Sequence, residues 1–339
     1  MTQLRVKVKK RVTVIGSGAY GCALAHLMEE KGNAHVTIWS HSENDCNKIN
    51  NEHICPILNV PINEDIECTT SLKDAVEDAS YIVMATASNF VKSTCENMKD
   101  YFDDDNQRIV LATKGMEGDQ VLSKVIQDTL GTNSLVYVIS GPAHAEQILK
   151  NGNTYLDYYG SEKFKNLIES EKTHLYTSDD PIGIQVGGAL KNVLSIGVGI
   201  LEGSGISSNE IAAFKTLGWR EIVQLGSCLG ASESTFYGLS GLGDLFTTTD
   251  SLDSRNKRCG LALAKGESIE EIKAKMAPAT IEGLNAIKSA LMIADKYGKL
   301  CPVIHGIQAA IVNSMDENKK SNKGNDLVKS LVLFRWKRY

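Results

Sequence analysis

The order of hydrophobic and polar positions predicts an α/β N-terminal half. From Arg11 an apolar run, a glycine-containing turn, a helical stretch and a second apolar run at Val36–Trp39 succeed one another. This order is typical of a β-strand, α-helix, β-strand unit with parallel strands. Three more apolar runs follow at 80–86, 108–113 and 135–140, and 154–160 could add a further strand. Continuous apolar strands of this kind are buried on both faces by helices, which indicates a doubly wound sheet.

The pattern changes beyond Pro181, where strand signals nearly vanish and apolar residues recur at helical spacing. We therefore expect a Rossmann-type, dinucleotide-binding domain in 1–180 and an all-α, substrate-binding and catalytic domain in 181–339. A length of 339 residues agrees with two domains. The stretch 182–201 is apolar enough to resemble a membrane span, but Lys191 lies in its middle, where charge in lipid is costly. We interpret it as a buried helix of a soluble core.

The composition excludes several classes of partner. A formal net charge of −5 gives no global attraction for nucleic acid. The eight cysteines form no C-x-x-C pair and no tight metal spacing, so we expect reduced thiols, a cytoplasmic protein and no metal. The basic leader at 1–11 is followed by no signal-peptide stretch, which favours a solvated segment over targeting, and the polar stretch 316–325 is interpreted as a surface loop.

A G-x-G-x-x-G motif, formed by Gly16, Gly18 and Gly21, lies between the first strand and the first helix. The first glycine permits a tight turn, the second lets backbone approach a pyrophosphate, and the third lets helix and strand pack closely. Because the N–H groups at the helix start face the anion, we predict a bound dinucleotide. The second strand ends at His41 with neither an acid for ribose hydroxyls nor an arginine for a 2′-phosphate. The sequence is therefore compatible with either NAD(H) or NADP(H) as the cofactor.

Lys191 and Asn192 lie inside an apolar helix rich in small residues. Burying an ammonium group is costly unless the group is paired or functional. We therefore interpret Lys191 as a chemical group rather than a lysine that snorkels to the surface. Desolvation lowers the pKa of a lysine toward the working range of a general acid/base, which the reversible oxidation of a secondary alcohol requires.

Six stretches together carry a family resemblance: 16–21 (GSGAYG), 113–117 (TKGME), 140–146 (SGPAHAE), 187–203 (GGALKNVLSIGVGILEG), 238–256 (GLSGLGDLFTTTDSLDSRN) and 281–283 (IEG). In this order they resemble the NAD(P)-dependent sn-glycerol-3-phosphate dehydrogenases of the bacterial type, from about residue 12 to about residue 310. The G-x-G-D-L…S-R-N block with its upstream K-N is far more specific than the glycine turn. The resemblance implies an oxidoreductase that interconverts dihydroxyacetone phosphate and sn-glycerol 3-phosphate with NAD(P)H, feeding glycerophospholipid synthesis.

The resemblance also implies roles for individual residues. Lys191 is the catalytic lysine, which gives a proton to the substrate carbonyl oxygen and accepts it in reverse, and Asp244 holds and charge-balances it. Arg255 grips the substrate phosphate, since a guanidinium can form two parallel hydrogen bonds to phosphate oxygens. The alternative, purely structural roles are helix capping or a turn for Asp244 and a surface position for Arg255.

The remaining assignments by resemblance fall into two groups. The substrate-side residues are Lys114, Gly141, Ala143, Asn192, Thr248, Ser254, Arg255 and Asn256. The cofactor-side residues are Gly16, Gly18, Ala19, Tyr20, Gly21, His41, Lys114, Ala145, Arg255, Thr280 and Glu282.

Three positions depart from the family pattern: Thr86 replaces a proline, His144 a phenylalanine and Leu217 an arginine. None removes a proposed catalytic group, although the first could alter nicotinamide contacts and the second the pocket wall. The alternatives are a related reductase of another small acid, of the ketopantoate reductase or hydroxyacid dehydrogenase type, and a regulator that binds NAD(H) without chemistry. We expect a small phosphorylated substrate, no nucleic acid and no membrane span. The small-residue helix at 186–200 can pack closely against a neighbour within the subunit or across a dimer, and we expect a homodimer.

Overall fold

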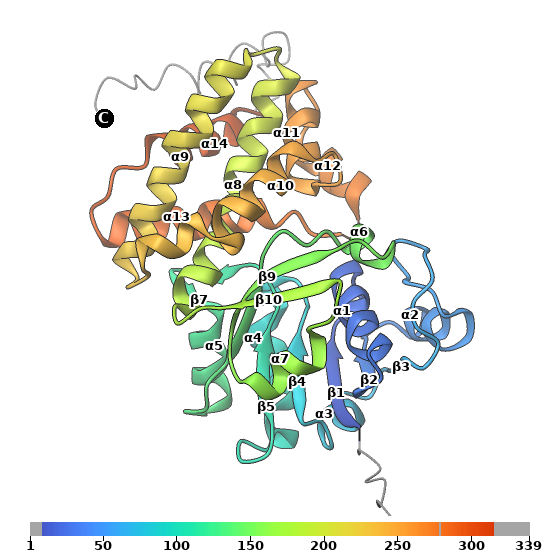
Figure 1. Cartoon of the computed structure of the whole chain (residues 1–339). Helices are drawn as coiled ribbons and strands as arrows, with labels where there is room; N and C mark the ends of the chain where they lie inside the picture. Colours follow the sequence, from blue (N-terminus) through green and yellow to red (C-terminus); the bar gives the residue numbers. More distant parts are fainter. Residues whose placement is uncertain (1–8, 278, 315–339) are drawn as a thin grey trace, which may run out of the picture. The chain divides into compact units, whose positions relative to one another are not determined.

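The computed structural model describes residues 9–277 and 279–314 (Figure 1). The expected solvated leader, in its part up to residue 8, and the expected loop at 316–325 lie outside the described residues. The chain divides into two compact units. The first comprises residues up to Thr113, Ser123–Ile139 and Ala143–Thr177, and the second comprises Lys114–Leu122, Ser140–Pro142 and the chain from Ser178 onward.

An eight-stranded sheet forms the centre of the first unit, in the order β10-β9-β8-β5-β4-β1-β2-β3. The strands are β1 (Lys10–Ile15), β2 (Ala34–Trp39), β3 (Glu67–Thr69), β4 (Tyr81–Met84), β5 (Arg108–Leu111), β8 (Tyr137–Ser140), β9 (Thr154–Tyr159) and β10 (Thr173–Thr177). β1 pairs in parallel with both β2 and β4, so the chain winds outward from β1 in two directions. In such a sheet a ligand binds outside the carboxyl ends of the strands, where the winding reverses. The predicted doubly wound sheet is confirmed.

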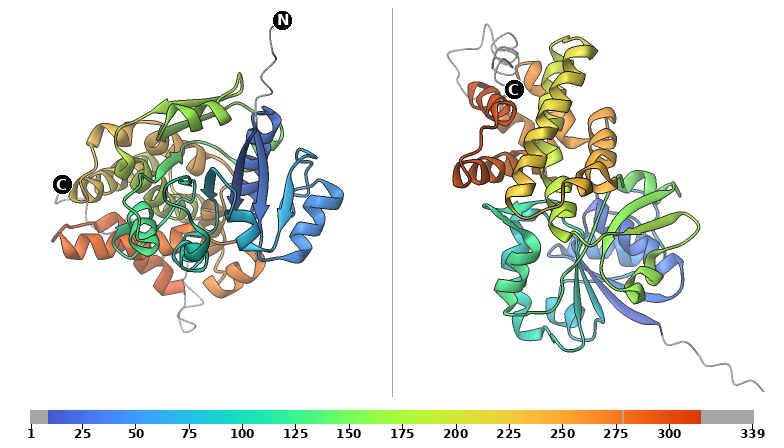
Figure 2. Two further views of the ribbon diagram at one scale, coloured as in Figure 1. Left: turned by 90° about the horizontal axis from the view of Figure 1, so that it is seen from below. Right: turned by 60° about the vertical axis from the view of Figure 1, so that its left-hand side comes forward.

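Helices lie on both faces of this sheet (Figure 2). They are α1 (Ala19–Glu30), α2 (Glu43–Asn47), α3 (Leu72–Val76), α4 (Val91–Met98), α5 (Leu122–Leu130), α6 (Ala145–Leu149) and α7 (Glu162–Ile168), with short turns η1 (Lys48–Glu52), η2 (Ser88–Phe90) and η3 (Lys99–Tyr101). All four residues of β4 are buried, as expected for an apolar strand covered on both sides. The sequence pattern did not indicate β3 and β10, because β3 has three residues and β10 carries mostly polar side chains.

The second unit is built mainly from helices. They are α8 (Pro181–Gly203), α9 (Ser208–Cys228), α10 (Asp244–Asp250), α11 (Arg255–Ala264), α12 (Ile269–Met276), α13 (Glu282–Lys296) and α14 (Pro302–Ser314), with turns η4 (Glu233–Tyr237) and η5 (Leu239–Gly243). A small antiparallel hairpin, β6 (Met116–Glu117) and β7 (Gln120–Val121), packs against α8. α8 is long and apolar enough to cross a membrane, but its most apolar window is completely buried inside the structure. The prediction of a buried helix is confirmed.

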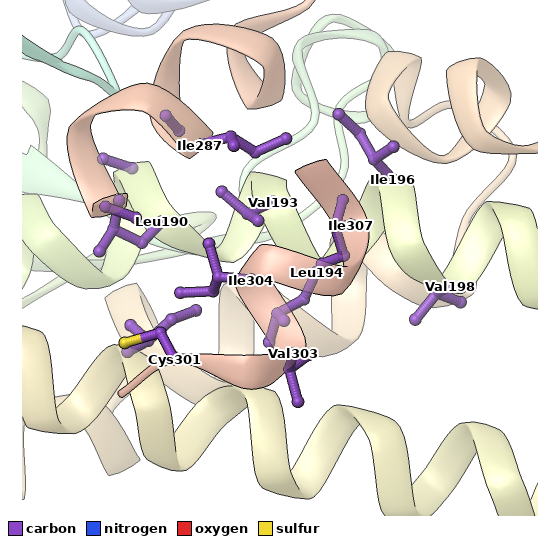
Figure 3. Packing of buried hydrophobic residues seen from close by; sticks show 14 of the residues in the cluster. Leu190, Val193, Leu194, Ile196, Val198, Ile287, Cys301, Val303, Ile304 and Ile307 are labelled. Carbon is purple, nitrogen blue, oxygen red and sulfur yellow. The ribbon is translucent and has the colours of Figure 1, made fainter. Parts of the chain in front are cut away.

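α8 is the central helix of this unit, in contact with α9, α10, α11, α13 and α14. Figure 3 shows Leu190, Val193 and Leu194 from α8 meeting side chains of α13 and α14. Each fully buried leucine, isoleucine or valine side chain contributes roughly 1.5–3 kcal/mol relative to an exposed one. Leu217, a departure from the family pattern, lies on α9 and packs against the same core.

Glycines let α8 and α11 approach closely. A Cβ added at Gly199 would lie 2.2 Å from the carbonyl oxygen of Lys257, and one at Gly260 would lie 2.1 Å from that of Ile196. Backbone cannot give way as a flexible side chain can, so any larger residue would push the helices apart. This crossing holds the middle of α11 against the C-terminal part of α8.

Candidate active site

The glycine turn in the first unit has the three properties that a dinucleotide requires. Gly16 adopts φ +120°, and a Cβ there would lie 3.0 Å from the carbonyl oxygen of Ala85. A Cβ at Gly21 would lie 2.1 Å from the carbonyl oxygen of Gly16, whereas one at Gly18 would meet nothing within 4 Å. The first and third glycines are therefore required by the fold, and the second leaves open space beside the turn.

The start of α1 suits an anion. Its first intrahelical hydrogen bond runs from the N–H of Cys22 to the carbonyl of Gly18, 3.0 Å away, so the N–H groups before it have no partner within the helix. The first turn contains no acidic residue. These groups and the helix dipole favour a pyrophosphate at this position.

A carboxylate that the sequence reasoning missed lies beside the turn. The Ser17 hydroxyl donates a hydrogen bond to Asp45, 2.6 Å away, and also lies 2.8 Å from the Ser40 hydroxyl at the end of β2. Asp45 belongs to α2, whose N-cap Ser42 accepts a hydrogen bond from the Asp45 N–H. The next helix therefore places a carboxylate beside the glycine turn, and the S-x-x-D capping sequence was the available signal.

A cluster of two lysines and one aspartate occupies the second unit. The Lys191 ammonium lies 2.5 Å from one oxygen of Asp244, and the Lys114 ammonium lies 2.7 Å from the other. Lys114 also donates to the carbonyl of Gly141, 2.9 Å away. α8 carries Lys191, α10 begins with Asp244, and Lys114 precedes the small hairpin. One carboxylate thus holds two ammonium groups in fixed positions.

Burial sets the protonation of this cluster. Desolvation lowers the pKa of Lys191 to about 7, with the Lys114 charge acting in the same direction and Asp244 opposing both. Burial alone would raise the pKa of Asp244, but the charges of Lys114 and Lys191 lower it below its ordinary value. Asp244 is therefore ionised at neutral pH, and Lys191 can both give and accept a proton there.

Hydroxyl groups connect Lys191 to the start of α11. The Lys191 ammonium donates a hydrogen bond to the Thr248 hydroxyl on α10. The Ser195 hydroxyl, one turn after Lys191 on α8, donates to the Thr248 carbonyl 3.2 Å away and lies 3.1 Å from the hydroxyl of Ser254. Ser254 is the N-cap of α11. Sequence reasoning missed Ser195, although a polar residue four positions after Lys191 lies on the same helix face.

Amide groups connect the same face of α8 to the starts of α11 and α13. Asn256 donates to the side-chain oxygen of Asn192, 2.8 Å away, and accepts from the Gly283 N–H, 2.9 Å away. Arg255 is the first residue of α11 and is exposed, and the charge of Glu282 acts on it. A guanidinium at the first position of a helix, beside free N–H groups, has the chemistry of a phosphate site.

The structure assigns the predicted site residues to two sets. The first unit contains Gly16, Gly18, Ala19, Tyr20, Gly21, His41, Ala143 and Ala145. The second unit contains Lys114, Gly141, Lys191, Asn192, Asp244, Thr248, Ser254, Arg255, Asn256, Thr280 and Glu282. In the second unit, hydrogen bonds and ion pairs join Lys114, Gly141, Lys191, Asp244, Thr248 and, through Ser195, Ser254. Asn192 pairs with Asn256, the charge of Glu282 acts on Arg255, and Thr280 lies in the loop before α13.

Two other departures from the family pattern lie in the first unit. Thr86 follows β4, with its backbone N–H beside Gly16 and its buried hydroxyl without a hydrogen-bond partner in the described structure. His144 is the N-cap residue of α6. Among residues 9–277 and 279–314, no group of three or more His, Cys, Asp or Glu side chains could hold a metal ion.

The first unit is a doubly wound sheet with a dinucleotide turn, and the second buries a lysine whose pKa is lowered to about 7. Together they define an NAD(P)-dependent dehydrogenase. Comparison with known families gives the particular one. The family models described as the N-terminus and the C-terminus of NAD-dependent glycerol-3-phosphate dehydrogenase match residues 11–157 and 180–321. The chain belongs to the NAD-dependent glycerol-3-phosphate dehydrogenase family.

Individual relatives agree with this family. The chain is 36% identical over 336 residues to glycerol-3-phosphate dehydrogenase [NAD(P)+] of Fusobacterium nucleatum, covering 96% of this chain and 99% of the relative. It is 33% identical to the enzyme of that name from Clostridium tetani, covering 91% and 89%. The crystal structure of glycerol-3-phosphate dehydrogenase from Coxiella burnetii superposes with a TM-score of 0.86 at 28% identity, covering 95% and 99%. These findings do not favour a ketopantoate reductase or hydroxyacid dehydrogenase.

Proposed function

We propose that this enzyme interconverts dihydroxyacetone phosphate and sn-glycerol 3-phosphate with NAD(P)H and so feeds glycerophospholipid synthesis. The observation that carries the proposal is the buried Lys114–Asp244–Lys191 cluster, which hydrogen bonds connect through Thr248 and Ser195 to the start of α11. One end of this network supplies a proton and the other an anion site. A substrate that carries both a carbonyl and a phosphate uses both ends.

Lys191 carries the proton transfer in this proposal. The glycine turn and the start of α1 would hold the dinucleotide, which when bound supplies or accepts the hydride. Lys191 in its ammonium form donates its proton to the carbonyl oxygen of the substrate, and in the reverse direction its neutral amine removes the alcohol proton. Asp244 keeps the ammonium form accessible, because without a counter-charge burial would lower the pKa of Lys191 further.

The start of α11 binds the phosphate in this proposal. Arg255 supplies two parallel N–H donors and Asn256 an amide, while Ser254 caps the helix through its hydrogen bond from the Lys257 N–H. Lys114 and Asn192 contact the substrate hydroxyl and carbonyl groups. From the family resemblance we also assign Arg255, Lys114, Thr280 and Glu282 to cofactor binding.

The proposal extends to the domains, the location and the assembly of the enzyme. We assign dinucleotide binding to residues 1–180 and substrate binding to 181–339, with Lys114 and Gly141 contributed to the helical unit from the earlier range. The eight cysteines are unpaired, which supports a reducing cytoplasmic location. The glycines of α8 pack against other helices of the same chain, so the homodimer that we propose would use another surface.

Steady-state oxidation of NADH, followed by its absorbance, tests the proposal directly. We expect turnover with dihydroxyacetone phosphate and little with unphosphorylated dihydroxyacetone. Arg255→Ala should raise the KM for dihydroxyacetone phosphate by roughly 10- to 100-fold, because charged hydrogen bonds contribute about 1.5–3 kcal/mol each. The KM for NADH should rise by a smaller factor, because Arg255 is one of several residues assigned to the cofactor.

Arg258→Ala is the matched control, since Arg258 is exposed on the same helix and lies outside the proposed site. Equal turnover of dihydroxyacetone or of an unphosphorylated keto acid would refute the substrate assignment. No rate at high enzyme concentration would refute the enzyme and leave a nucleotide-binding regulator.

A further inference from the structure

Four of the eight cysteines gather in one part of the first unit. Cys22 lies on α1, Cys46 on α2, Cys68 on β3 and Cys55 between η1 and β3, and all four are buried in one hydrophobic cluster. They form two pairs. The Cys22 thiol, which donates a hydrogen bond to the Ser17 carbonyl 3.3 Å away, interacts with Cys55, and the sulfur atoms of Cys46 and Cys68 lie 2.7 Å apart. That second separation is only about 0.7 Å longer than a disulfide bond.

Hydrogen bonds from the Asn50 side chain to the backbone of Cys68 hold the Cys46–Cys68 pair in place. The side chain of Asn50 donates to the carbonyl of Cys68, 2.9 Å away, and accepts from the Cys68 N–H, 2.7 Å away. Asn50 lies four positions after Cys46, on the same side of the helical segment formed by α2 and η1. The two hydrogen bonds of Asn50 therefore hold α2 and η1 against β3, and with them the sulfur of Cys46 beside that of Cys68.

The pair is also the most accessible of the buried thiols to a small oxidant. Cys46 and Cys68 are 6% and 8% exposed, whereas Cys22, Cys55, Cys95 and Cys259 are each 0% exposed. Burial raises the pKa of Cys68, which keeps it as a thiol. A small oxidant that reaches either sulfur of this pair therefore finds the second sulfur beside it.

We propose that Cys46 and Cys68 are a thiol-oxidation site that forms a reversible disulfide with hydrogen peroxide. One sulfur of the pair attacks a peroxide oxygen as its thiolate and breaks the O–O bond, giving a sulfenic acid and releasing hydroxide, which takes up a proton as water. The other sulfur then attacks the sulfenic sulfur, forms the S–S bond and releases a second water. The two thiols lose two electrons and two protons in total, and one peroxide is reduced to two waters.

The disulfide has a structural consequence at the cofactor end of the unit. Asp45, next to Cys46, accepts the hydrogen bond from Ser17 in the glycine turn. A covalent bond from α2 to β3 closes a chain loop and holds Asp45 beside that turn. Loop closure restricts the unfolded chain, so the oxidised protein should unfold at a higher temperature.

Differential alkylation of the full-length protein with mass spectrometry tests this site. The protein is treated with hydrogen peroxide, blocked with one alkylating reagent, reduced with dithiothreitol and labelled with a second. We expect the second label on Cys46 and Cys68, a linked peptide between them before reduction, and a rise of roughly 5 °C or more in the unfolding midpoint. Dithiothreitol should reverse both effects.

Cys68→Ser and Cys46→Ser should each abolish the linked peptide and the rise in midpoint, while Cys95→Ser, which removes a buried thiol from another helix, should retain both. If a serine variant fails to fold, the linked peptide and the unfolding midpoint of the oxidised parent protein still decide the proposal. A linked Cys22–Cys55 peptide, no linked peptide, or an unchanged midpoint in the oxidised parent would overturn it.

Discussion

Asp244→Asn is the substitution whose effect follows most directly from the geometry of the cluster. The amide has nearly the same shape as the carboxylate but carries no charge, so the buried ammonium of Lys191 and the half-buried ammonium of Lys114 lose the counter-charge 2.5 and 2.7 Å away. Removing one partner of a buried ion pair costs about 3–5 kcal/mol. One pKa unit corresponds to about 1.36 kcal/mol. The pKa of Lys191, which is about 7 in the intact cluster, should therefore fall by roughly two units or more.

The pH dependence of carbonyl reduction reports this change. Reduction needs the ammonium form of Lys191, and the fraction in that form decreases as the pH rises through the pKa. We expect kcat for reduction in the parent enzyme to decline above about pH 7. In Asp244→Asn the decline should begin near pH 5 or below, and the rate at pH 7 should fall by roughly 10- to 100-fold, since a stronger acid partly offsets the loss of protonated lysine.

Asp250→Asn provides the control, because Asp250 lies on the same helix and pairs with Lys215 at the exposed surface, 2.6 Å away. Its pH profile should match that of the parent. A profile of Asp244→Asn with an unchanged or higher pKa, measured on protein whose circular dichroism shows a native fold, would refute the electrostatic reasoning.

Three further predictions concern the framework of the site. Gly21→Ala should weaken NADH binding by at least 10-fold in fluorescence titration, because the new Cβ would lie 2.1 Å from a backbone oxygen of the turn, and unchanged affinity would contradict this. Gly199→Ala should lower the unfolding midpoint by several degrees through the same kind of clash with α11 and leave NADH affinity nearly intact. Asp45→Asn should raise kcat/KM with NADPH relative to NADH by roughly 10-fold, because a carboxylate near the ribose repels a 2′-phosphate, and an unchanged ratio would exclude Asp45 from cofactor selection.

Local patterns in the sequence predicted much of the architecture. The apolar runs became buried parallel strands, the glycine motif became a turn that only glycine fits at two positions, and the apolar stretch around Lys191 became the central buried helix α8. These features depend on periodicity and backbone geometry within short segments. The short strand β3 carries too few residues to show a pattern.

Contacts between segments that are distant in the chain could not be predicted from the sequence. The motif suggested that Asp244 would pair with Lys191, but the shared contact with Lys114 depends on how the hairpin packs against the helical unit. Asp45 was not predicted because the acid of a dinucleotide site ordinarily follows the second strand directly, whereas Asp45 reaches the glycine turn from the next helix, α2. Ser195 was missed because a serine in a small-residue helix is ordinarily a packing residue.

The central claim is that Lys191 transfers the proton during carbonyl reduction. The most direct measurement is the single-turnover rate of NADH oxidation by dihydroxyacetone phosphate in Lys191→Ala against the parent at pH 7. The account predicts a loss of roughly 10²- to 10⁴-fold, the range for general acid/base catalysis, with NADH affinity unchanged. A rate close to that of the parent would contradict it.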